Sequence, residues 1–375
     1  MNSNLPLGLA NDIKNAFGIG GETVKAEAFG NGNINDTYLV YIQSGDSVAR
    51  YIFQRVNRAV FTNPEDIAKN VSGVTTHIAN KLRLAGEKDI ERRVVKYYRN
   101  ISGGYYHITE SGDYWRVMSY IYDSVCFDTA DNTLLFNTGV AFGEFQRLLS
   151  DFPAETLCVT IPDFHNTPAR YAQLALAAGA DAFSRLCEVK AEYDYLLSQS
   201  ENACRLCRLA DSGAIPLRVV HNDTKCNNVM FDAKTGKNLA VVDLDTVMPG
   251  LIAYDFGDAV RFAANPGGED CEDLSEVFLD TDAFAAFARG YVGQIRGSVS
   301  RFELDTLADG VLAVTLELAA RFLTDYLCGD SYFKCKKERH NLIRARAQIA
   351  LARDIITKIP TIGSVLDSIT NRNEA

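Results

Sequence analysis

The sequence predicts an α+β fold with two lobes, an N-terminal lobe built on an antiparallel sheet and a larger C-terminal lobe that is mostly helical. Up to about residue 122 the chain is rich in short runs of alternating apolar and polar residues, the pattern of half-buried strands. Longer segments with helical periodicity dominate the remainder. A chain of 375 residues with 47% hydrophobic content is long enough to bury two cores. We therefore divide the chain into residues 1–118 and residues 119–375.

The first lobe is predicted to hold a sheet that is interrupted by one helix. This helix should run from about Pro64 to Ala85, because Pro is tolerated in the first helical turn and the acidic Glu65 and Asp66 favour the positive end of the helix dipole. Turns rich in Gly, Asn, Ser and Asp separate the expected strands. We place these strands at residues 24–28, 38–42, 49–56, 94–98, 104–109 and 114–122.

The second lobe is predicted to be helical apart from one β-hairpin. Two short apolar runs, residues 229–231 and 239–242, are joined by a polar segment that contains Gly236, which is typical of two strands and a turn. Around this hairpin, apolar residues recur with helical spacing. We expect the helices at about residues 133–150, 167–178, 180–211, 255–263, 281–296, 302–328 and 337–357.

Composition and charge favour a soluble, cytoplasmic protein. No run approaches the roughly 18–20 apolar residues of a membrane span, and the N-terminus shows no basic segment followed by an apolar one. A net charge of −10 argues against nucleic acid as a partner. The nine Cys are expected to be reduced thiols. Cys204 and Cys207 are spaced like zinc ligands, but they have no second pair or His nearby, so we expect a helical coincidence.

An acid, an amide and a second acid are spaced around the predicted hairpin. Asp223 lies five residues before Asn228, which enters the first strand, and Asp243 leaves the second strand. Because a hairpin brings its ends together, Asn228 and Asp243 should lie side by side, with Asp223 on the preceding loop. His-Asn-Asp alone could be a turn with capping side chains, and Asp-Leu-Asp alone could be a solvated strand end. The order and spacing of both together favour a functional site.

Phosphoryl transfer requires these residue types. The protein must align an acceptor oxygen with the γ-phosphate and offset the charge on the phosphate oxygens, and Mg²⁺ supplies much of that charge. Mg²⁺ is typically held by one or two protein carboxylates together with the phosphates. We therefore predict a kinase in which Asp223 accepts the proton of a hydroxyl and Asn228 and Asp243 hold Mg²⁺. Asp245 lies on the same side of the strand and is a further candidate metal ligand.

These motifs resemble the catalytic segments of the aminoglycoside phosphotransferase and choline kinase superfamily, in which His-Gly-Asp-x4-Asn and Ile-Asp have the same order and spacing. Further segments are similar to the N-acetylhexosamine 1-kinases of that superfamily. They are residues 29–38, 115–117, 164–168, 221–228, 243–250, 254–258, 261–262, 321–327 and 329–333. The resemblance implies a protein-kinase-like fold, ATP and Mg²⁺ as cofactors, and transfer of the γ-phosphoryl group to the anomeric hydroxyl of N-acetylglucosamine or N-acetylgalactosamine.

Nucleotide contacts are predicted in and just after the first lobe. Gly30 and Gly32 lie between two strands, where they could let backbone N–H groups approach phosphates or simply form a hairpin turn. The third strand lacks the Lys that protein kinases use for the α- and β-phosphates. Gln54 and Arg55 point to opposite faces of that strand, so either could face the nucleotide, and a solvated Arg55 is an equal alternative. The resemblance implies that the segment leaving the sheet binds adenine through its backbone. Its candidates are Ser119, Tyr120 and Ile121.

Sugar recognition requires polar side chains near Asp223, because hydroxyl and acetamido groups are distinguished through hydrogen bonds. Arg321 is the first candidate, since a charge in an otherwise apolar helical stretch is costly unless it is paired or functional. Pairing with Glu317, four residues earlier, is the alternative. The resemblance adds further candidates. They are Tyr332, Thr246 and Asn33. We expect His221 to fix the catalytic loop by hydrogen bonding rather than to act as an acid or base.

Two other functions stay open. A kinase of the same superfamily that acts on homoserine, choline or an aminoglycoside would share every catalytic residue. A choline pocket would need aromatic side chains and an aminoglycoside pocket a cluster of acids, and an Arg in the pocket suits neither. A nucleotide-binding protein without turnover is suggested by the missing Lys. The sequence does not determine the preference between gluco and galacto epimers or the oligomeric state.

Overall fold

The chain forms two compact units in a computed structural model that describes residues 4–30 and 35–371. The first unit contains residues 1–125, 157–161 and 230–247, and the second contains residues 126–156, 162–229 and 248–375. Two segments from later in the chain therefore pack with the N-terminal part. The division of the lobes at residue 118 stays a prediction.

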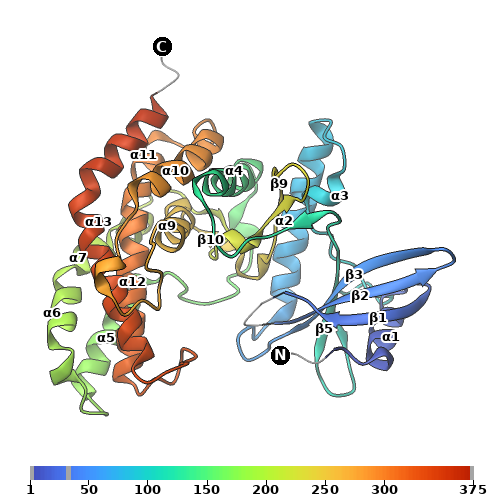
Figure 1. The fold of residues 1–375 in the computed structure, drawn as a ribbon, viewed down its shortest axis with the longest axis horizontal. Coiled ribbons are helices and arrows are strands. Elements are labelled where there is room, and N and C mark those ends of the chain that lie inside the picture. Colours follow the sequence, from blue (N-terminus) through green and yellow to red (C-terminus); the bar gives the residue numbers. More distant parts are fainter. Residues whose placement is uncertain (1–3, 31–34, 372–375) are drawn as a thin grey trace. The chain divides into compact units, whose positions relative to one another are not determined.

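The first unit is built on a five-stranded antiparallel sheet in the order β1-β2-β3-β5-β4 (Figure 1). Its strands are β1 (Glu22–Ala28), β2 (Asp36–Ser44), β3 (Ser47–Val56), β4 (His107–Ile108) and β5 (Tyr114–Ser119). Helix α1 (Leu7–Ala16), which the sequence patterns did not indicate, contributes Ile13 to a buried cluster with Phe53 and Trp115. The predicted sheet is confirmed, and Trp115 is a core residue, 2% exposed.

Helix α2 (Pro64–Leu84) confirms the predicted helix of the first unit, with Pro64 in its first turn. The predicted strand at residues 94–98 is wrong. This segment makes one isolated bridge, between Tyr97 and Met118, because it exchanges few ladder hydrogen bonds with the end of β5. A short helix, α3 (Ile90–Arg93), precedes it.

The predicted hairpin is present. Strands β8 (Val229–Asp232) and β9 (Asn238–Val241) are neighbours in a three-stranded sheet whose third member is β6 (Ser124–Val125). The carboxylate of Asp232 accepts hydrogen bonds from the backbone N–H groups of Lys234 (3.1 Å) and Thr235 (2.8 Å) and so closes the turn. Gly236 has a φ of 67°, which a residue without Cβ adopts at no steric cost.

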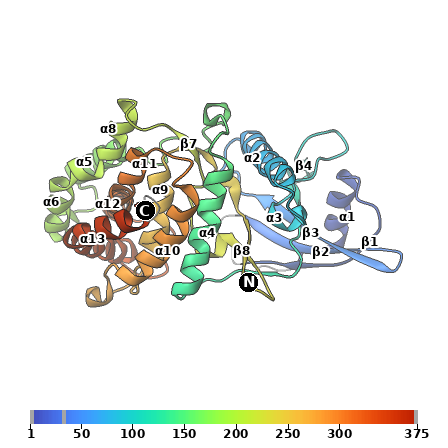
Figure 2. The same ribbon diagram turned by 90° about the horizontal axis from the view of Figure 1, so that it is seen from above.

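The second unit is a helical assembly with one small two-stranded sheet, β7 (Arg218–Val220) with β10 (Met248–Gly250) (Figures 1 and 2). Its longer helices are α4 (Asn132–Leu148), α5 (Thr167–Ala180), α6 (Lys190–Ser198), α9 (Ile252–Ala263), α10 (Thr281–Ile295), α12 (Leu307–Leu327) and α13 (His340–Thr370). Helices α9 and α12 approach so closely that a Cβ on Gly310 would lie 1.9 Å from the carbonyl oxygen of Ala253. Only a residue without Cβ permits this close approach. The packing against α12 holds α9, which carries residues of the candidate site.

Three helix predictions need correction. Residues 180–211 do not form one helix. Asp181 adopts a left-handed conformation (φ 37°) at the end of α5, and its side chain accepts the backbone N–H groups of Arg185 and Leu186, so no helix starts at residue 180. The stretch is divided among α6, α7 (Ser200–Ala203) and α8 (Arg205–Asp211). Residues 302–328 are likewise divided between α11 (Arg301–Asp305) and α12. Helix α13 continues beyond residue 357 through the exposed Pro360, since burial of Ile362 and later apolar residues holds its last turns.

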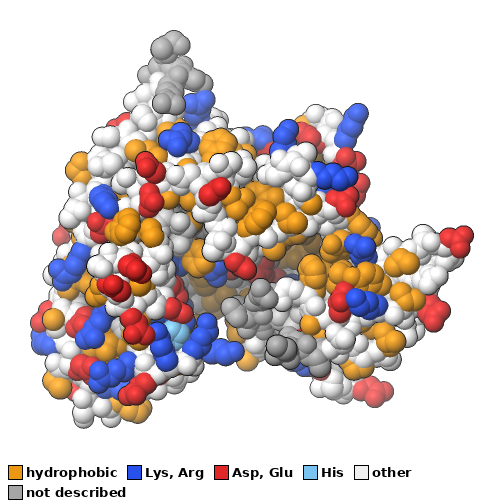
Figure 3. Space-filling view, in the orientation of Figure 1, with side chains coloured by type: hydrophobic (Ala, Val, Ile, Leu, Met, Phe, Trp, Pro, Cys, Tyr) orange, Lys and Arg blue, Asp and Glu red, His pale blue; other side chains and the backbone are white. Residues whose placement is uncertain are grey.

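Charged side chains of both signs are interspersed over the face of the second unit drawn in Figure 3. Ion pairs such as Arg346 with Glu192 (2.6 Å) and Arg344 with Asp270 (2.6 Å) join its helices and loops. Among the described residues, no helix combines the length and the apolar character that crossing a membrane requires.

Candidate active site

Helix α9 holds the loop that carries Asp223. The buried carboxylate of Asp255, 1% exposed, accepts hydrogen bonds from the backbone N–H groups of His221 (2.8 Å) and Asn222 (2.7 Å). The hydroxyl of Thr224 donates to the carbonyl of Asp255 (2.7 Å). These bonds satisfy buried polar groups on both sides and leave the loop little freedom.

His221 is fully buried beside Phe142 and Phe145, with ring centroids 5.5 and 6.0 Å apart. Its Nδ1 accepts the backbone N–H of Asp223 (3.3 Å), and Asn222 adopts a left-handed φ of 65°. The buried imidazole therefore holds the turn through this hydrogen bond, which is the kind of structural role expected for it.

Asp223 and Asn228 lie together in the second unit. The amide nitrogen Nδ2 of Asn228 donates to the carbonyl (2.9 Å) and to Oδ2 (3.2 Å) of Asp223. Lys225 Nζ lies 2.6 Å from Oδ1 of Asp223. Burial opposes the charge of Lys225, but Asp223 and Asp258 outweigh it and raise the pKa of the ammonium group. Lys225 was missed as a site residue in the sequence, although its position two residues after Asp223 was a signal.

Asp258 also supports this loop. Its Oδ2 accepts the backbone N–H of Thr224 (3.1 Å), and its Oδ1 pairs with Arg261 (3.0 Å) on the next turn of α9. Burial disfavours the charge of Asp258, but Arg261 and Lys225 lower the pKa of its carboxyl group below the ordinary value. A charged Asp258 thus anchors the loop from the same helix as Asp255.

Asp243 follows β9 in the first unit. It is exposed and adopts a left-handed conformation (φ 58°, ψ 58°), from which the chain enters a 3₁₀ turn, η4 (Leu244–Thr246). Asp245, two residues later, is 2% exposed, and its Oδ1 lies 2.7 Å from Nη1 of Arg116. A carboxylate that neutralises a buried guanidinium is a poor ligand for a second cation.

The two candidates on β3 face different surroundings. Arg55 pairs with Asp36 (2.5 Å) and Asp113 (3.3 Å) on an exposed surface. Gln54 Oε1 accepts a hydrogen bond from Nε of Arg116 (2.9 Å), so Gln54 lies on the face that carries the buried pair of Arg116 and Asp245. The proposed contact of Arg55 with nucleotide would have to compete with these two carboxylates.

The other nucleotide candidates that the structure describes lie at or just after the ends of strands β1 and β5. Gly30 has a φ of 75° with open space where a Cβ would be, whereas Gly32 and Asn33 lie outside the described residues. Ser119 ends β5, and its Oγ accepts the backbone N–H of Lys96 (2.9 Å). Tyr120 packs edge-on against Phe29 and Tyr122, and Ile121 belongs to a buried cluster with Met118.

Arg321 and Tyr332 are brought together in the second unit. The guanidinium of Arg321 lies 5.4 Å from the ring centroid of Phe333, which in turn packs against Tyr332 at 4.8 Å. Asp325 holds this loop, because its carboxylate accepts the backbone N–H groups of Tyr332 (2.8 Å) and Phe333 (2.8 Å). Tyr332 is 73% exposed, so its hydroxyl is open to a ligand.

The family of the chain follows from comparison with known proteins. Residues 25–288 match the model of APH, the phosphotransferase enzyme family. The chain belongs to this family.

Solved structures similar to this phosphotransferase share its fold. They include a microcompartment-associated aminopropanol kinase, with a TM-score of 0.61 and 16% identity over 96% of this chain and 99% of that one. An aminoglycoside phosphotransferase from Alicyclobacillus acidocaldarius has a TM-score of 0.61 and 12% identity over 98% of each chain. A spectinomycin phosphotransferase solved with ADP and spectinomycin has a TM-score of 0.54 and 13% identity over 94% of this chain and 100% of that one. The predicted α+β, protein-kinase-like fold is confirmed.

The alternative partner of Arg321, Glu317, is already engaged in this phosphotransferase. Its Oε1 lies 3.1 Å from Nδ1 of His165, and its Oε2 accepts the hydroxyl of Thr167 (2.6 Å). Burial disfavours its charge, but the contacts with His165 and Thr167, together with the charge of Arg321, outweigh burial and lower the pKa of Glu317. Glu317 is therefore a buried charged anchor between α12 and the start of α5.

We expect Glu317→Gln to lower the free energy of unfolding at pH 7 by about 1–3 kcal/mol, because Gln keeps only one acceptor oxygen and so one of the two buried contacts, with His165 or with Thr167, is lost. The lowered pKa means that the stability from ionised Glu317 is present above its ordinary value of 4.5 and is lost as the pH falls through the lowered pKa. Urea unfolding at pH 7 and at steps down to pH 3 should therefore show the difference from wild type shrinking. The exposed Glu201→Gln is the matched control, and a difference that stays constant with pH would contradict the expectation.

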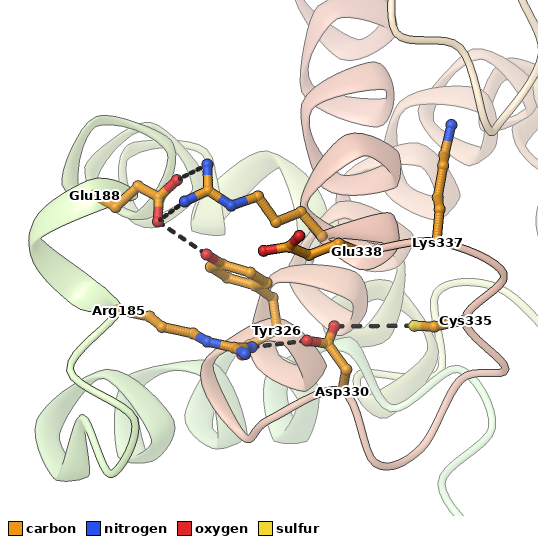
Figure 4. Close-up of a pocket in the computed structure, with 8 residues that line it drawn as sticks. Arg185, Glu188, Tyr326, Asp330, Cys335, Lys337 and Glu338 are labelled. Carbon is orange, nitrogen blue, oxygen red and sulfur yellow. Dashed lines mark hydrogen bonds and ion pairs between the residues drawn. The ribbon is translucent and has the colours of Figure 1, made fainter.

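A pocket of about 290 Å³ lies elsewhere in the second unit of this phosphotransferase, beside the loop after α12 (Figure 4). Arg185 pairs there with Asp330 (2.7 Å), and Arg339 pairs with Glu188 (2.8 Å). The hydroxyl of Tyr326 donates to Glu188 (2.9 Å). These contacts offset the opposite charges, and none of the predicted site residues that the structure describes lines the pocket, so we assign it no catalytic role.

Proposed function

We propose that this phosphotransferase transfers the γ-phosphoryl group of ATP to the anomeric hydroxyl of an N-acetylhexosamine, giving the sugar 1-phosphate and ADP. The observation that carries the proposal is the loop between His221 and Asn228, in which Asp223 is held by Asn228 and Lys225 and the backbone is anchored by Asp255. A carboxylate fixed in this way can receive a proton without rearrangement.

In the proposed reaction Asp223 accepts the proton of the sugar hydroxyl as the sugar oxygen forms its bond to the γ-phosphorus. The bond between that phosphorus and the bridging oxygen breaks, and its electrons leave with ADP. Lys225, next to Asp223, offers a positive charge toward which the transferring group can be drawn. Arg321 and Tyr332 would orient the sugar, with Thr246 and Asn33 as further candidates.

The residues present fit Mg²⁺. Nδ2 of Asn228 donates to Asp223, and within the described part of the chain no hydrogen bond takes up its Oδ1, which leaves an amide oxygen for a hard cation. Asp243 supplies an exposed carboxylate after β9. We propose these two oxygens as the ligands. The ion would offset the charge of the triphosphate.

Use of ATP is supported by the family and by the ADP bound in the similar spectinomycin phosphotransferase. We propose that Gly30 and Gly32 approach the phosphates, with Arg55 as a further contact. The backbone of Ser119, Tyr120 and Ile121 would meet the adenine.

We expect Arg321→Ala to raise the KM for the sugar by about 10–100-fold, the loss from one charged hydrogen bond of about 1.5–3 kcal/mol. Nucleotide affinity should not change, because the contacts of Arg321 lie with Phe333 in the second unit. Steady-state kinetics over a range of sugar concentrations measures the effect. Arg289→Ala, an exposed Arg on α10, is the control. An unchanged KM would remove Arg321 from the sugar site.

An ATP-consumption assay with a panel of free sugars, amino alcohols, homoserine and aminoglycosides tests the proposed function. Turnover with N-acetylglucosamine or N-acetylgalactosamine, and formation of the 1-phosphate seen by phosphorus NMR, would support it. Turnover only with choline, an amino alcohol or an aminoglycoside would show that this compound, and not the sugar, is the substrate. Nucleotide binding without turnover on any member would favour a regulatory nucleotide-binding protein.

A further inference from the structure

Arg116 and Asp245 form a deeply buried ion pair two residues from Asp243, the proposed metal ligand of the first unit. Their side chains are each 3% exposed, Nη1 lies 2.7 Å from Oδ1, and Nη2 donates to Oδ2 at 2.8 Å. One charge-assisted hydrogen bond, from Nη2 to Oδ2, together with the close approach of Nη1 to Oδ1, holds the two groups against each other. The two residues lie 129 positions apart, on β5 and in the turn η4 that follows Asp243.

Two amide side chains hydrogen-bond to this pair, and Arg116 also lies 5.4 Å from the ring centroid of Tyr97. Nδ2 of Asn35 donates to Oδ2 of Asp245 (2.8 Å), and Oδ1 of Asn35 accepts the backbone N–H of Asn57 (2.9 Å). Gln54 accepts from Arg116 and donates to the hydroxyl of Thr37 (2.8 Å). The carboxylate is thereby connected to three strands of the sheet, so it has little freedom to rotate.

The segment after Asp243 is held at its far end as well. Nδ2 of Asn70, a fully buried residue of α2, donates to the carbonyl of Val247 (2.9 Å). Leu244 is also buried, whereas Asp243 itself is exposed and takes a left-handed conformation. The buried Leu244 and the anchored Val247 thus restrict the backbone from which the exposed carboxylate of Asp243 projects.

We propose that Arg116 is a positioning residue: by pairing with Asp245 it fixes residues 243–247 and so orients the carboxylate of Asp243 toward the metal–nucleotide. The inference rests on the proposed function, in which Asp243 is a metal ligand, and it gives Asp245 an orienting role in place of the ligand role predicted from its sequence position. Residues that orient a ligand commonly alter metal affinity by 10–100-fold when they are replaced.

The cost of burying the pair supports a role beyond stability. Taking two charges out of water costs several kcal/mol per ion, and the mutual attraction roughly repays this, so apolar residues of similar volume often stabilise a protein as well or better. Removing one partner alone would leave an uncompensated buried charge. Arg116→Met combined with Asp245→Leu removes both charges together. It leaves Asn35 and Gln54 each without one hydrogen-bond partner, at a cost of about 1–3 kcal/mol each, which is less than the cost of one uncompensated buried charge.

The experiment compares this double variant with wild type, with Asp243→Ala and with Arg92→Met. Arg92 forms an ion pair of the same length, 2.7 Å, with Asp232 in the turn at the other end of the hairpin. Binding of Mn²⁺, as a stand-in for Mg²⁺, is measured by electron paramagnetic resonance in the presence of ADP. Affinity for ADP without metal and the thermal midpoint are measured in parallel.

We expect the double variant to stay folded with a lowered thermal midpoint, to keep its metal-free ADP affinity, and to lose about 10–100-fold in Mn²⁺ affinity. Arg92→Met should keep the wild-type Mn²⁺ affinity. If Asp243→Ala binds Mn²⁺ more weakly than wild type but the double variant keeps the wild-type Mn²⁺ affinity, the proposal is overturned. Unchanged affinity in Asp243→Ala as well would instead show that the metal role of Asp243, and with it the proposed site, is wrong. A double variant that fails to fold would also overturn the positioning role, because the pair would then serve the fold.

Discussion

Asp223→Asn is expected to lower kcat by about 10²–10⁴-fold, the usual contribution of a general base. Asn retains the shape of the side chain and one acceptor oxygen for Lys225, but it cannot take the proton of the sugar hydroxyl. Because the loop is anchored through the backbone of His221 and Asn222, the substitution should not displace it. Nucleotide affinity and the KM for the sugar should therefore stay within a few-fold of wild type.

Steady-state kinetics together with calorimetric titration of nucleotide separates these quantities. The matched control is Asp282→Asn, an exposed Asp in the first turn of α10, which should keep the wild-type kcat. If the kcat of Asp223→Asn stayed within about threefold of the wild-type kcat, Asp223 would not be the base. A loss of nucleotide binding equal to the loss of kcat would assign Asp223 to the nucleotide site instead.

The parts of the fold that the sequence predicted are those whose signal is local. The hairpin of β8 and β9 follows from two short apolar runs and Gly236, and α2 follows from Pro64 and the helical spacing behind it. Hydrophobic periodicity was insufficient where the backbone conformation of one residue decides whether a helix continues. Asp181 ends α5 by adopting a left-handed φ, although helical spacing continues on both sides of it.

The candidate site shows the same division. The spacing from Asp223 to Asn228 is local, and the structure places the two side chains in contact. The partners that hold the site are distant in sequence: Asp255 lies 34 residues from His221, and Arg116 lies 129 residues from Asp245. A single sequence carries no signal for such pairs, because hydrophobic periodicity reports which face is buried and not which polar groups meet there.

Asp255→Ala is expected to have the largest effect on stability. Three donors, the backbone N–H groups of His221 and Asn222 and Nε2 of Gln146 (2.8 Å), would lose their acceptor in a buried environment. Each orphaned group costs about 1–3 kcal/mol, so we expect the free energy of unfolding to fall by about 3 kcal/mol or more. The loop of Asp223 should open locally, and kcat should fall with it.

Chemical denaturation and amide hydrogen exchange together distinguish a local from a general effect. We expect exchange to rise most in residues 218–228, which the carboxylate of Asp255 anchors, before it rises in α10 or α13. The control is Asp309→Ala, which removes a partly exposed ion pair with Arg205 (3.2 Å) and should cost less than about 1 kcal/mol. If Asp255→Ala kept wild-type protection in the loop and lost less than about 1 kcal/mol, solvent would have replaced the carboxylate as acceptor. Asp255 would then not be what holds Asp223 in position.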